Sequence, residues 1–236
     1  MFQGHFVGRV ARACRAYRDQ IGNNILTLWS RYSASRYSTT GKIKSMGKLT
    51  LILGGARSGK STFAEQRAKE LGGESVLYVA TSETKDEEMH QRVAKHCADR
   101  PSGWGTVEAS RNVAQAIRRE RSAAKVILLD CMTFLVANQL MDAAAPEDDP
   151  FDAPSSDPFD AQIEADVVAE VEALVAYVQD ADIEMLVVSN EVGLGVVPPY
   201  ELGRAYRDIL GRANQILARH ADEVQLLVAG IPMKVK

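Results

Sequence analysis

Apolar residues are arranged along the chain in two alternating patterns, short continuous runs and longer stretches with helical spacing. A short apolar run predicts a buried strand, whereas apolar residues three or four positions apart predict an amphipathic helix. Strands are predicted at 49–53, 75–80, 125–130, 184–189 and 223–229. Helices are predicted at 62–71, 86–98, 110–124, 133–142, 163–179 and 200–220. This alternation favours an α/β fold in which helices cover both faces of a mostly parallel sheet of five strands.

Two segments lack either pattern. Residues 143–160 contain four prolines and six acidic residues with little to bury, so we expect an exposed, mobile insert within the domain. Residues 1–45 are rich in Arg, Ser and Tyr and lack the apolar core of a secretory signal. They are interpreted as a dispensable basic extension, with a transit-type segment or a basic interaction arm as alternatives, and the working domain is expected to span residues 46–236.

The first predicted strand leads directly into the pattern G-x-x-x-x-G-K-S. In such a loop the glycines let successive backbone N–H groups point at phosphate oxygens, the lysine neutralises the outer phosphates, and the serine hydroxyl can ligate Mg²⁺. A helix follows the loop, as phosphate binding requires, whereas a plain glycine-rich turn would leave the Lys-Ser pair unexplained. The predicted binding residues are Gly54, Gly55, Ala56, Arg57, Ser58, Gly59, Lys60 and Ser61. The fold is therefore expected to be a P-loop NTPase-type, RecA-like sheet, with Lys60 also serving catalysis.

Polar residues follow three further predicted strands, at the end where parallel sheets bind ligands. Thr81 and Ser82 follow 75–80, and they are also suitable for capping the next helix. Asp130 ends 125–130 in the manner of a Walker B aspartate that holds Mg²⁺ together with Ser61, although an acidic cap is the alternative. Asn190 and Glu191 follow 184–189 and enter an irregular loop with two glycines and two prolines, as site-lining loops often are.

His96 lies near the end of the helix predicted at 86–98. A single helical histidine is usually a surface or capping residue. Here three basic residues, Arg92, Lys95 and Arg100, occur close to it in the sequence. They would attract phosphates and keep the imidazole neutral by lowering its pKa, which is the form a nucleophile needs.

Charge and cysteine content limit the function classes. Residues 1–48 hold nine basic residues and one acid, leaving 19 basic and 30 acidic residues in the rest, a net charge of −11. Such an acidic body gives no support to nucleic-acid binding. No apolar run approaches the length of a membrane span. Three widely spaced cysteines without a C-x-x-C pair argue against a disulfide framework or zinc site and favour a cytoplasmic location.

Taken together, several motifs give the chain a specific resemblance over residues 49–236. They are GGARSGKS at 54–61, YVATS at 78–82, the block from Arg92 through His96 to Glu108, LLDC at 128–131, SNEVGLGVVP at 189–198 and the closing GIPMKVK. In this combination the chain resembles the bifunctional adenosylcobinamide kinase / adenosylcobinamide-phosphate guanylyltransferase family of cobalamin synthesis. The phosphate loop alone would not single out this family, but the His96 block and the NEVG segment do.

The resemblance implies that the chain phosphorylates adenosylcobinamide with ATP or GTP. It further implies transfer of GMP from GTP to adenosylcobinamide phosphate through a guanylylated His96, with release of pyrophosphate, and a homotrimeric assembly. Some relatives carry a second histidine where this chain has Lys95, a departure that keeps positive charge beside the phosphates. The GTP contacts implied by the resemblance are the phosphate loop, Ala80, Thr81, Ser82, Cys97, Ala98, Asp99, Arg100, Glu108 and Asp130.

Two other functions are consistent with parts of the sequence. A single-function P-loop kinase of small metabolites, or an NTPase, explains the phosphate loop and Asp130 but gives the His96 block no purpose. A non-catalytic nucleotide-gated binding protein could use the basic extension to reach a partner. The sequence does not identify the preferred phosphoryl donor, the corrinoid contacts, or whether one site serves both reactions.

Overall fold

The structure, a computed structural model, describes residues 46–82, 101–120, 124–143 and 157–236, which belong to one compact unit, Met46–Lys236. The basic extension, the helix predicted at 86–98 and residues 144–156 of the acidic insert lie outside the described residues. Predictions for those segments stay predictions.

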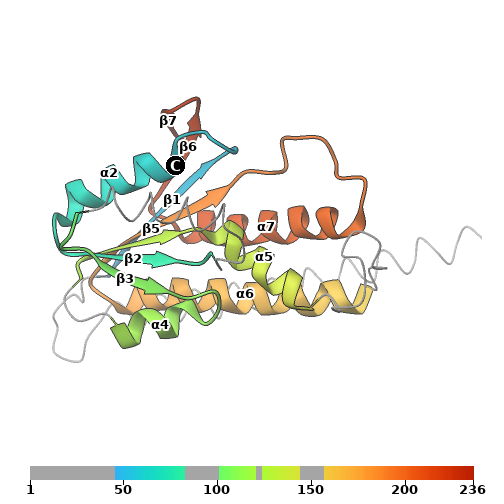
Figure 1. The fold of residues 1–236 in the computed structure, drawn as a ribbon, viewed down its shortest axis with the longest axis horizontal. Coiled ribbons are helices and arrows are strands. Elements are labelled where there is room, and N and C mark those ends of the chain that lie inside the picture. Colours follow the sequence, from blue (N-terminus) through green and yellow to red (C-terminus); the bar gives the residue numbers. More distant parts are fainter. Residues whose placement is uncertain (1–45, 83–100, 121–123, 144–156) are drawn as a thin grey trace, which may run out of the picture. The chain divides into compact units, whose positions relative to one another are not determined.

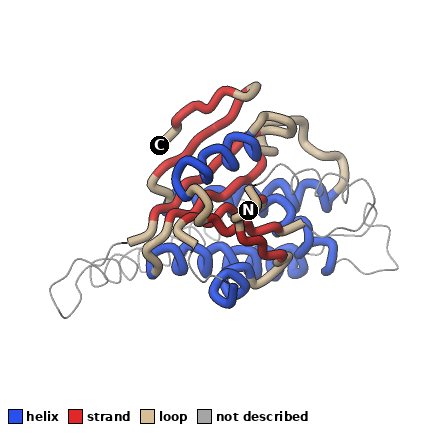
Figure 2. Tube along the Cα trace, turned by 60° about the vertical axis from the view of Figure 1, so that its left-hand side comes forward, coloured by secondary structure: helices blue, strands red, loops and turns tan. Residues whose placement is uncertain are grey.

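One sheet, seen as a red band in Figure 2, contains the seven strands of the described residues. They are β1 (Lys48–Gly54), β2 (Val76–Ala80), β3 (Gly105–Glu108), β4 (Val126–Asp130), β5 (Glu184–Asn190), β6 (Glu223–Val228) and β7 (Ile231–Lys234). Their order is β3-β2-β4-β5-β1-β6-β7. All neighbouring pairs are parallel except β6 and β7, which form an antiparallel hairpin.

Five described helices cover this sheet (Figure 1): α2 (Lys60–Gly72), α4 (Val113–Glu120), α5 (Met132–Ala143), α6 (Asp157–Asp180) and α7 (Glu201–His220). Apolar residues of α2 pack on one face, and those of the other four helices pack on the opposite face, except that Phe134 of α5 packs on the α2 side. The prediction of an α/β, P-loop NTPase-type sheet with helices on both faces is confirmed.

The central strands are buried on both faces, and this explains their continuous apolar runs. In β4, Ile127 and Leu129 pack in the core shared with α4, α5, α6 and α7, while Leu128 packs on the α2 side; all three have no exposed surface. Because side chains alternate along a strand, Asp130 faces the α2 side, where the phosphate loop begins that helix.

The expected five strands are corrected to seven. The additional strands, β3 and β7, have four residues each, and neither is a buried run: β3 buries only Val107, and β7 is exposed throughout. Ala229 and Gly230 connect β6 to β7 with φ angles of 51° and 83°, as a tight hairpin turn requires. An antiparallel edge strand of this kind needs no core pattern, so the periodicity of the sequence does not reveal it.

Two helices also begin three or more residues away from their predicted starts. α4 begins at Val113 rather than at residue 110, because the Glu170 carboxylate of α6 accepts hydrogen bonds from the Asn112 and Val113 N–H groups, at 2.9 and 2.6 Å. α6 begins at Asp157, so residues 157–160 are helical rather than part of the acidic insert. Pro158 suits a first helical turn, where an N–H has no intrahelical partner.

Within the described ranges, every helix falls short of the combined length and apolar character of a membrane span.

Gly47 precedes β1 at a place where a side chain does not fit. A Cβ there would lie 2.5, 2.6 and 2.8 Å from the carbonyl oxygens of Val178, Ala181 and Ile183. We expect Gly47→Ala to lower the free energy of unfolding by about 3 kcal/mol in urea denaturation, because backbone atoms would have to move. As a control, a Cβ at Gly211 in α7 meets nothing within 4 Å, so Gly211→Ala should raise stability by about 1 kcal/mol. Equal stability of the two variants would contradict this account.

Candidate nucleotide-binding site

The predicted binding residues within the described ranges gather at the carboxyl edge of the sheet. In the strand register, Ala80 at the end of β2 pairs with Glu108 and with Asp130, and Gly54 at the end of β1 pairs with Asn190. Residues far apart in the sequence are therefore brought to one edge. This is where open α/β sheets bind ligands.

The phosphate loop forms the turn between β1 and α2. Arg57 and Gly59 have positive φ angles, 57° and 89°, and the Phe63 N–H donates to the Gly59 carbonyl at 3.0 Å to begin the helix. Left-handed residues of this kind are typical of loops whose backbone N–H groups bind phosphate oxygens.

Lys60 lies across the loop. Its ammonium donates to the Gly55 carbonyl oxygen at 3.1 Å, and its side chain is half-exposed. A nucleotide phosphate would replace this neutral carbonyl partner with an anionic one, and hydrogen bonds to charged groups are stronger. The lysine is thus held over the loop that is expected to bind phosphates.

The β6–β7 turn supports the phosphate loop from outside, a contact that the sequence analysis missed. The Gly230 N–H donates to the Ser58 carbonyl at 2.9 Å. A Cβ on Gly59 would lie 3.2 Å from the Gly230 Cα, so the two backbones approach closely. The turn lies in the closing GIPMKVK motif, but the motif was used only for the family resemblance and predicted no contact with the phosphate loop.

Two polar atoms at this edge are buried without a hydrogen-bond partner within the described structure: the Ser58 hydroxyl and the Asn190 Oδ1. Such groups are costly unless something satisfies them. Ser58 belongs to the phosphate loop, and its hydroxyl can donate to a phosphate oxygen. Asn190, which follows the predicted strand 184–189, was not among the predicted site residues.

Thr81 has a structural role in this region. Its fully buried hydroxyl donates to the Cys131 carbonyl at 2.5 Å and accepts from the Cys131 N–H at 2.9 Å. The Thr81 carbonyl accepts from the Asn138 amide at 2.8 Å. These bonds join the ends of β2 and β4, and a contact of Thr81 with a nucleotide stays a prediction. The alternative of helix capping involves a helix outside the described residues.

Asp130 is half-buried at the end of β4 and accepts a hydrogen bond from the Tyr78 hydroxyl at 3.2 Å on Oδ2. Ser61 is half-exposed at the start of α2. Carboxylate and hydroxyl oxygens are ligands that Mg²⁺ accepts, and Mg²⁺ usually needs only one or two carboxylates beside substrate phosphates. The described residues contain no cage of three or more His, Cys, Asp or Glu side chains. These residues fit an ion that binds together with a nucleotide.

The thiol of Cys131, next to Asp130, is unreactive. Burial raises the pKa of its thiol to about 11, and the nearby Asp130 carboxylate adds to the rise. The thiol is therefore protonated at neutral pH and does not serve as a nucleophile at this edge.

The remaining predicted site residues lie either outside the described ranges or far from the phosphate loop. His96, Cys97, Ala98, Asp99 and Arg100 lie outside the described residues. Glu108 is exposed on β3, separated from β1 by β2, β4 and β5. At roughly 4.8 Å per strand, it lies on the order of 19 Å across the sheet from the phosphate-loop strand. A single nucleotide that touches both must extend along the strand ends.

Comparison with known proteins identifies the family. The sequence profile of the cobinamide kinase / cobinamide phosphate guanyltransferase family matches residues 50–235. The chain belongs to this family. The resemblance noted from the motifs, and the expectation of a transferase, are confirmed.

Two relatives align with this family member over nearly their whole length. The bifunctional adenosylcobalamin biosynthesis protein CobU of Escherichia coli (strain K12) is 41% identical over 191 residues, covering 80% of this chain and 99% of CobU. The corresponding CobP of Pseudomonas aeruginosa (strain PAO1) is 40% identical over 186 residues, covering 79% and 96%. Among solved structures, the RadB recombinase matches with a TM-score of 0.42 and 15% identity, covering 79% of this chain and 77% of RadB.

If the β6–β7 turn holds the phosphate loop in place, Gly230→Ala should weaken nucleotide binding. Alanine is strained at the φ of 83°, at a cost of about 1–2 kcal/mol, and relief of this strain would shift the N–H that holds Ser58. We expect the Kd for GTP to rise about tenfold in isothermal titration calorimetry.

Gly73→Ala is the matched control. Gly73 also has a positive φ, 56°, and open space around a Cβ, but it ends α2 away from the loop. It should lose similar stability and keep its GTP affinity. Equal Kd values for the two variants would contradict a role of the turn in nucleotide binding.

Proposed function

We propose that the chain phosphorylates adenosylcobinamide with ATP or GTP and then transfers GMP from GTP to adenosylcobinamide phosphate, giving adenosylcobinamide-GDP and pyrophosphate. The observation that carries this proposal is the alignment with proteins named bifunctional along nearly their whole length. The phosphate loop at the carboxyl edge, with its orphan Ser58 hydroxyl, supplies the physical support.

In the kinase step, the alcohol oxygen of adenosylcobinamide attacks the γ-phosphorus and gives up its proton to water, the bond to the β–γ bridging oxygen breaks, and the nucleoside diphosphate leaves. Phosphoryl transfer of this kind depends mainly on positioning and charge neutralisation. The loop N–H groups hold the phosphates, and Lys60 exchanges its Gly55 partner for a phosphate oxygen. Mg²⁺ bound by Ser61 and Asp130 together with the phosphates would neutralise charge that develops on the phosphate oxygens.

In the guanylyl step, an imidazole nitrogen of His96 attacks the α-phosphorus of GTP, and the bond to the α–β bridging oxygen breaks to release pyrophosphate. A phosphate oxygen of adenosylcobinamide phosphate then attacks the same phosphorus. The P–N bond breaks, and its electron pair returns to the imidazole. A covalent intermediate divides one difficult displacement into two easier ones. The basic residues near His96 in the sequence support this role.

The family resemblance also supports a homotrimer with sites near subunit boundaries, and the cysteine pattern supports a cytoplasmic location. The competing function is a single P-loop kinase or NTPase without a covalent intermediate. It shares the phosphoryl-transfer step but does not use His96 as a nucleophile.

Lys60→Ala should reduce the phosphorylation of adenosylcobinamide by about 10²–10³ in kcat, because it removes one preorganised cation from the transferring phosphate. The formation of adenosylcobinamide phosphate from labelled ATP or GTP measures this. Lys69→Ala is the matched control, since Lys69 is exposed on the same helix and should retain full activity. Undiminished activity of Lys60→Ala would refute the role of the loop.

Incubation with GTP labelled at the α-phosphate distinguishes the bifunctional enzyme from a plain kinase. We expect an acid-labile, base-stable protein adduct that is lost in His96→Ala and kept in His90→Ala, a histidine variant in the same predicted helix. A phosphoramidate has this pattern of stability. Labelling that persists in His96→Ala would assign the nucleophile elsewhere, and no labelling of the unaltered chain would favour the plain kinase.

A further inference from the structure

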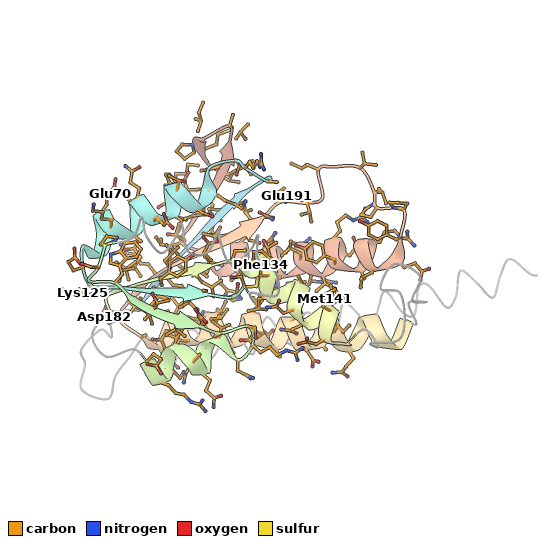
Figure 3. All side chains as sticks on the ribbon, in the orientation of Figure 1. Glu70, Lys125, Phe134, Met141, Asp182 and Glu191 are labelled. Carbon is orange, nitrogen blue, oxygen red and sulfur yellow. The ribbon has the colours of Figure 1, made fainter. Side chains whose placement is uncertain are left out.

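The loop between β5 and α7 exposes apolar side chains to an unusual extent. Leu194 is 86% exposed, Val196 95% and Val197 57%, and Tyr200 at the end of the loop is 42% exposed. Figure 1 shows this orange loop as a broad arch between the two elements, and in Figure 3 its side chains extend outward beyond the labelled Glu191. Contiguous apolar surface of this kind usually marks a binding site.

Both ends of this arch are held by hydrogen bonds. At its start, the Gly193 N–H donates to the Glu191 carboxylate at 2.6 Å. At its end, the Arg204 guanidinium of α7 donates to the carbonyl oxygens of Pro198 and Pro199, at 3.2 and 2.7 Å. The prolines further restrict the backbone. The backbone that carries the exposed side chains is therefore restrained. Binding there would cost less conformational entropy than binding to an unrestrained loop.

The arch begins at the phosphate loop. The Glu191 N–H donates to the Gly54 carbonyl oxygen at 3.0 Å, and Gly54 is the first residue of the phosphate loop. The strand that precedes the arch, β5, lies between β1 and β4, which end in Gly54 and Asp130. A molecule on the arch is thus adjacent to the groups expected to bind the triphosphate.

We infer that residues 194–200 form the surface on which the corrinoid substrate lies, with the apolar rim of its macrocycle against Leu194, Val196 and Val197. The inference rests on the proposed function, which requires a large macrocyclic acceptor beside the phosphate loop. Residues 192–200 carry no charged side chain, which suits the methyl-bearing edge of a corrin ring better than its amide arms. The alcohol to be phosphorylated would then extend from the ring toward Gly54.

A second copy of the chain is the competing occupant. The four exposed side chains offer on the order of a few hundred Å² of apolar surface, the size of a ligand or peptide patch. A stable protein interface buries about 800 Å² on each partner. The arch alone therefore suits a ligand better than a subunit.

The test compares Leu194→Asn/Val196→Thr with Val235→Thr, a control at another exposed apolar position, 65% exposed after β7. Adenosylcobinamide is the varied substrate in the kinase assay, at saturating GTP. The double variant should raise KM for adenosylcobinamide about tenfold with little change in kcat, because it removes apolar contact shared by ground state and transition state. The control variant should leave both constants unchanged.

Labelling with α-labelled GTP in the absence of corrinoid serves as an independent readout. The double variant should form the protein adduct at the normal rate, since this step needs no corrinoid. Unchanged KM overturns the inference, and slowed adduct formation assigns the arch to the nucleotide instead. A changed oligomeric state in size-exclusion chromatography with light scattering assigns it to a second copy. If the unaltered chain fails to phosphorylate adenosylcobinamide, the proposed function fails instead.

Discussion

Parallel pairing of β1 with β5, and of β5 with β4, brings Gly54, Asn190 and Asp130 to the same edge of the sheet. The ladder pairs Gly54 with Asn190 and Asp130 with Val188, so the ends of three strands meet although their residues are distant in sequence. Burial on both faces maintains this pairing, because a shift of one residue would turn side chains such as Leu128 and Leu129 to the wrong cores. The location of the site thus follows from the sheet register, which fixes the positions that its side chains occupy.

Much of the fold could be predicted from the sequence, because β1, β2, β4 and β5 are buried on both faces and their apolar runs carry a strong signal. The phosphate loop could be predicted for a different reason, since its glycines and the Lys60-Ser61 pair have conformational and chemical requirements that few other turns share. β3 and β7 could not be predicted, because their stability comes from pairing with a neighbour that the sequence pattern does not reveal. The start of α4 depends in the same way on Glu170, a residue of another helix.

Within the candidate site, residue type was a better guide to location than to role. Thr81 is predicted to contact the nucleotide, and the structure adds a role that the sequence did not predict: its hydroxyl joins two strands by hydrogen bonds to both backbone groups of Cys131. Asn190 was passed over, yet it carries a buried amide oxygen that nothing in the described structure satisfies. Whether a polar side chain is already occupied depends on tertiary contacts, and these are not encoded in local spacing.

The hydrogen bond between Gly230 and Ser58 also has a consequence for folding. The phosphate loop lies early in the domain, but β6 beside it and the turn that supports it come from the end of the chain; the Leu49 N–H likewise bonds to Asp222, 173 positions later. Contacts of such long range are slow to form, because a large loop must close first. The loop would acquire its phosphate-binding shape only when the late strands dock. During synthesis on the ribosome, affinity for nucleotide would therefore arise only after residues 222–230 have left the exit tunnel.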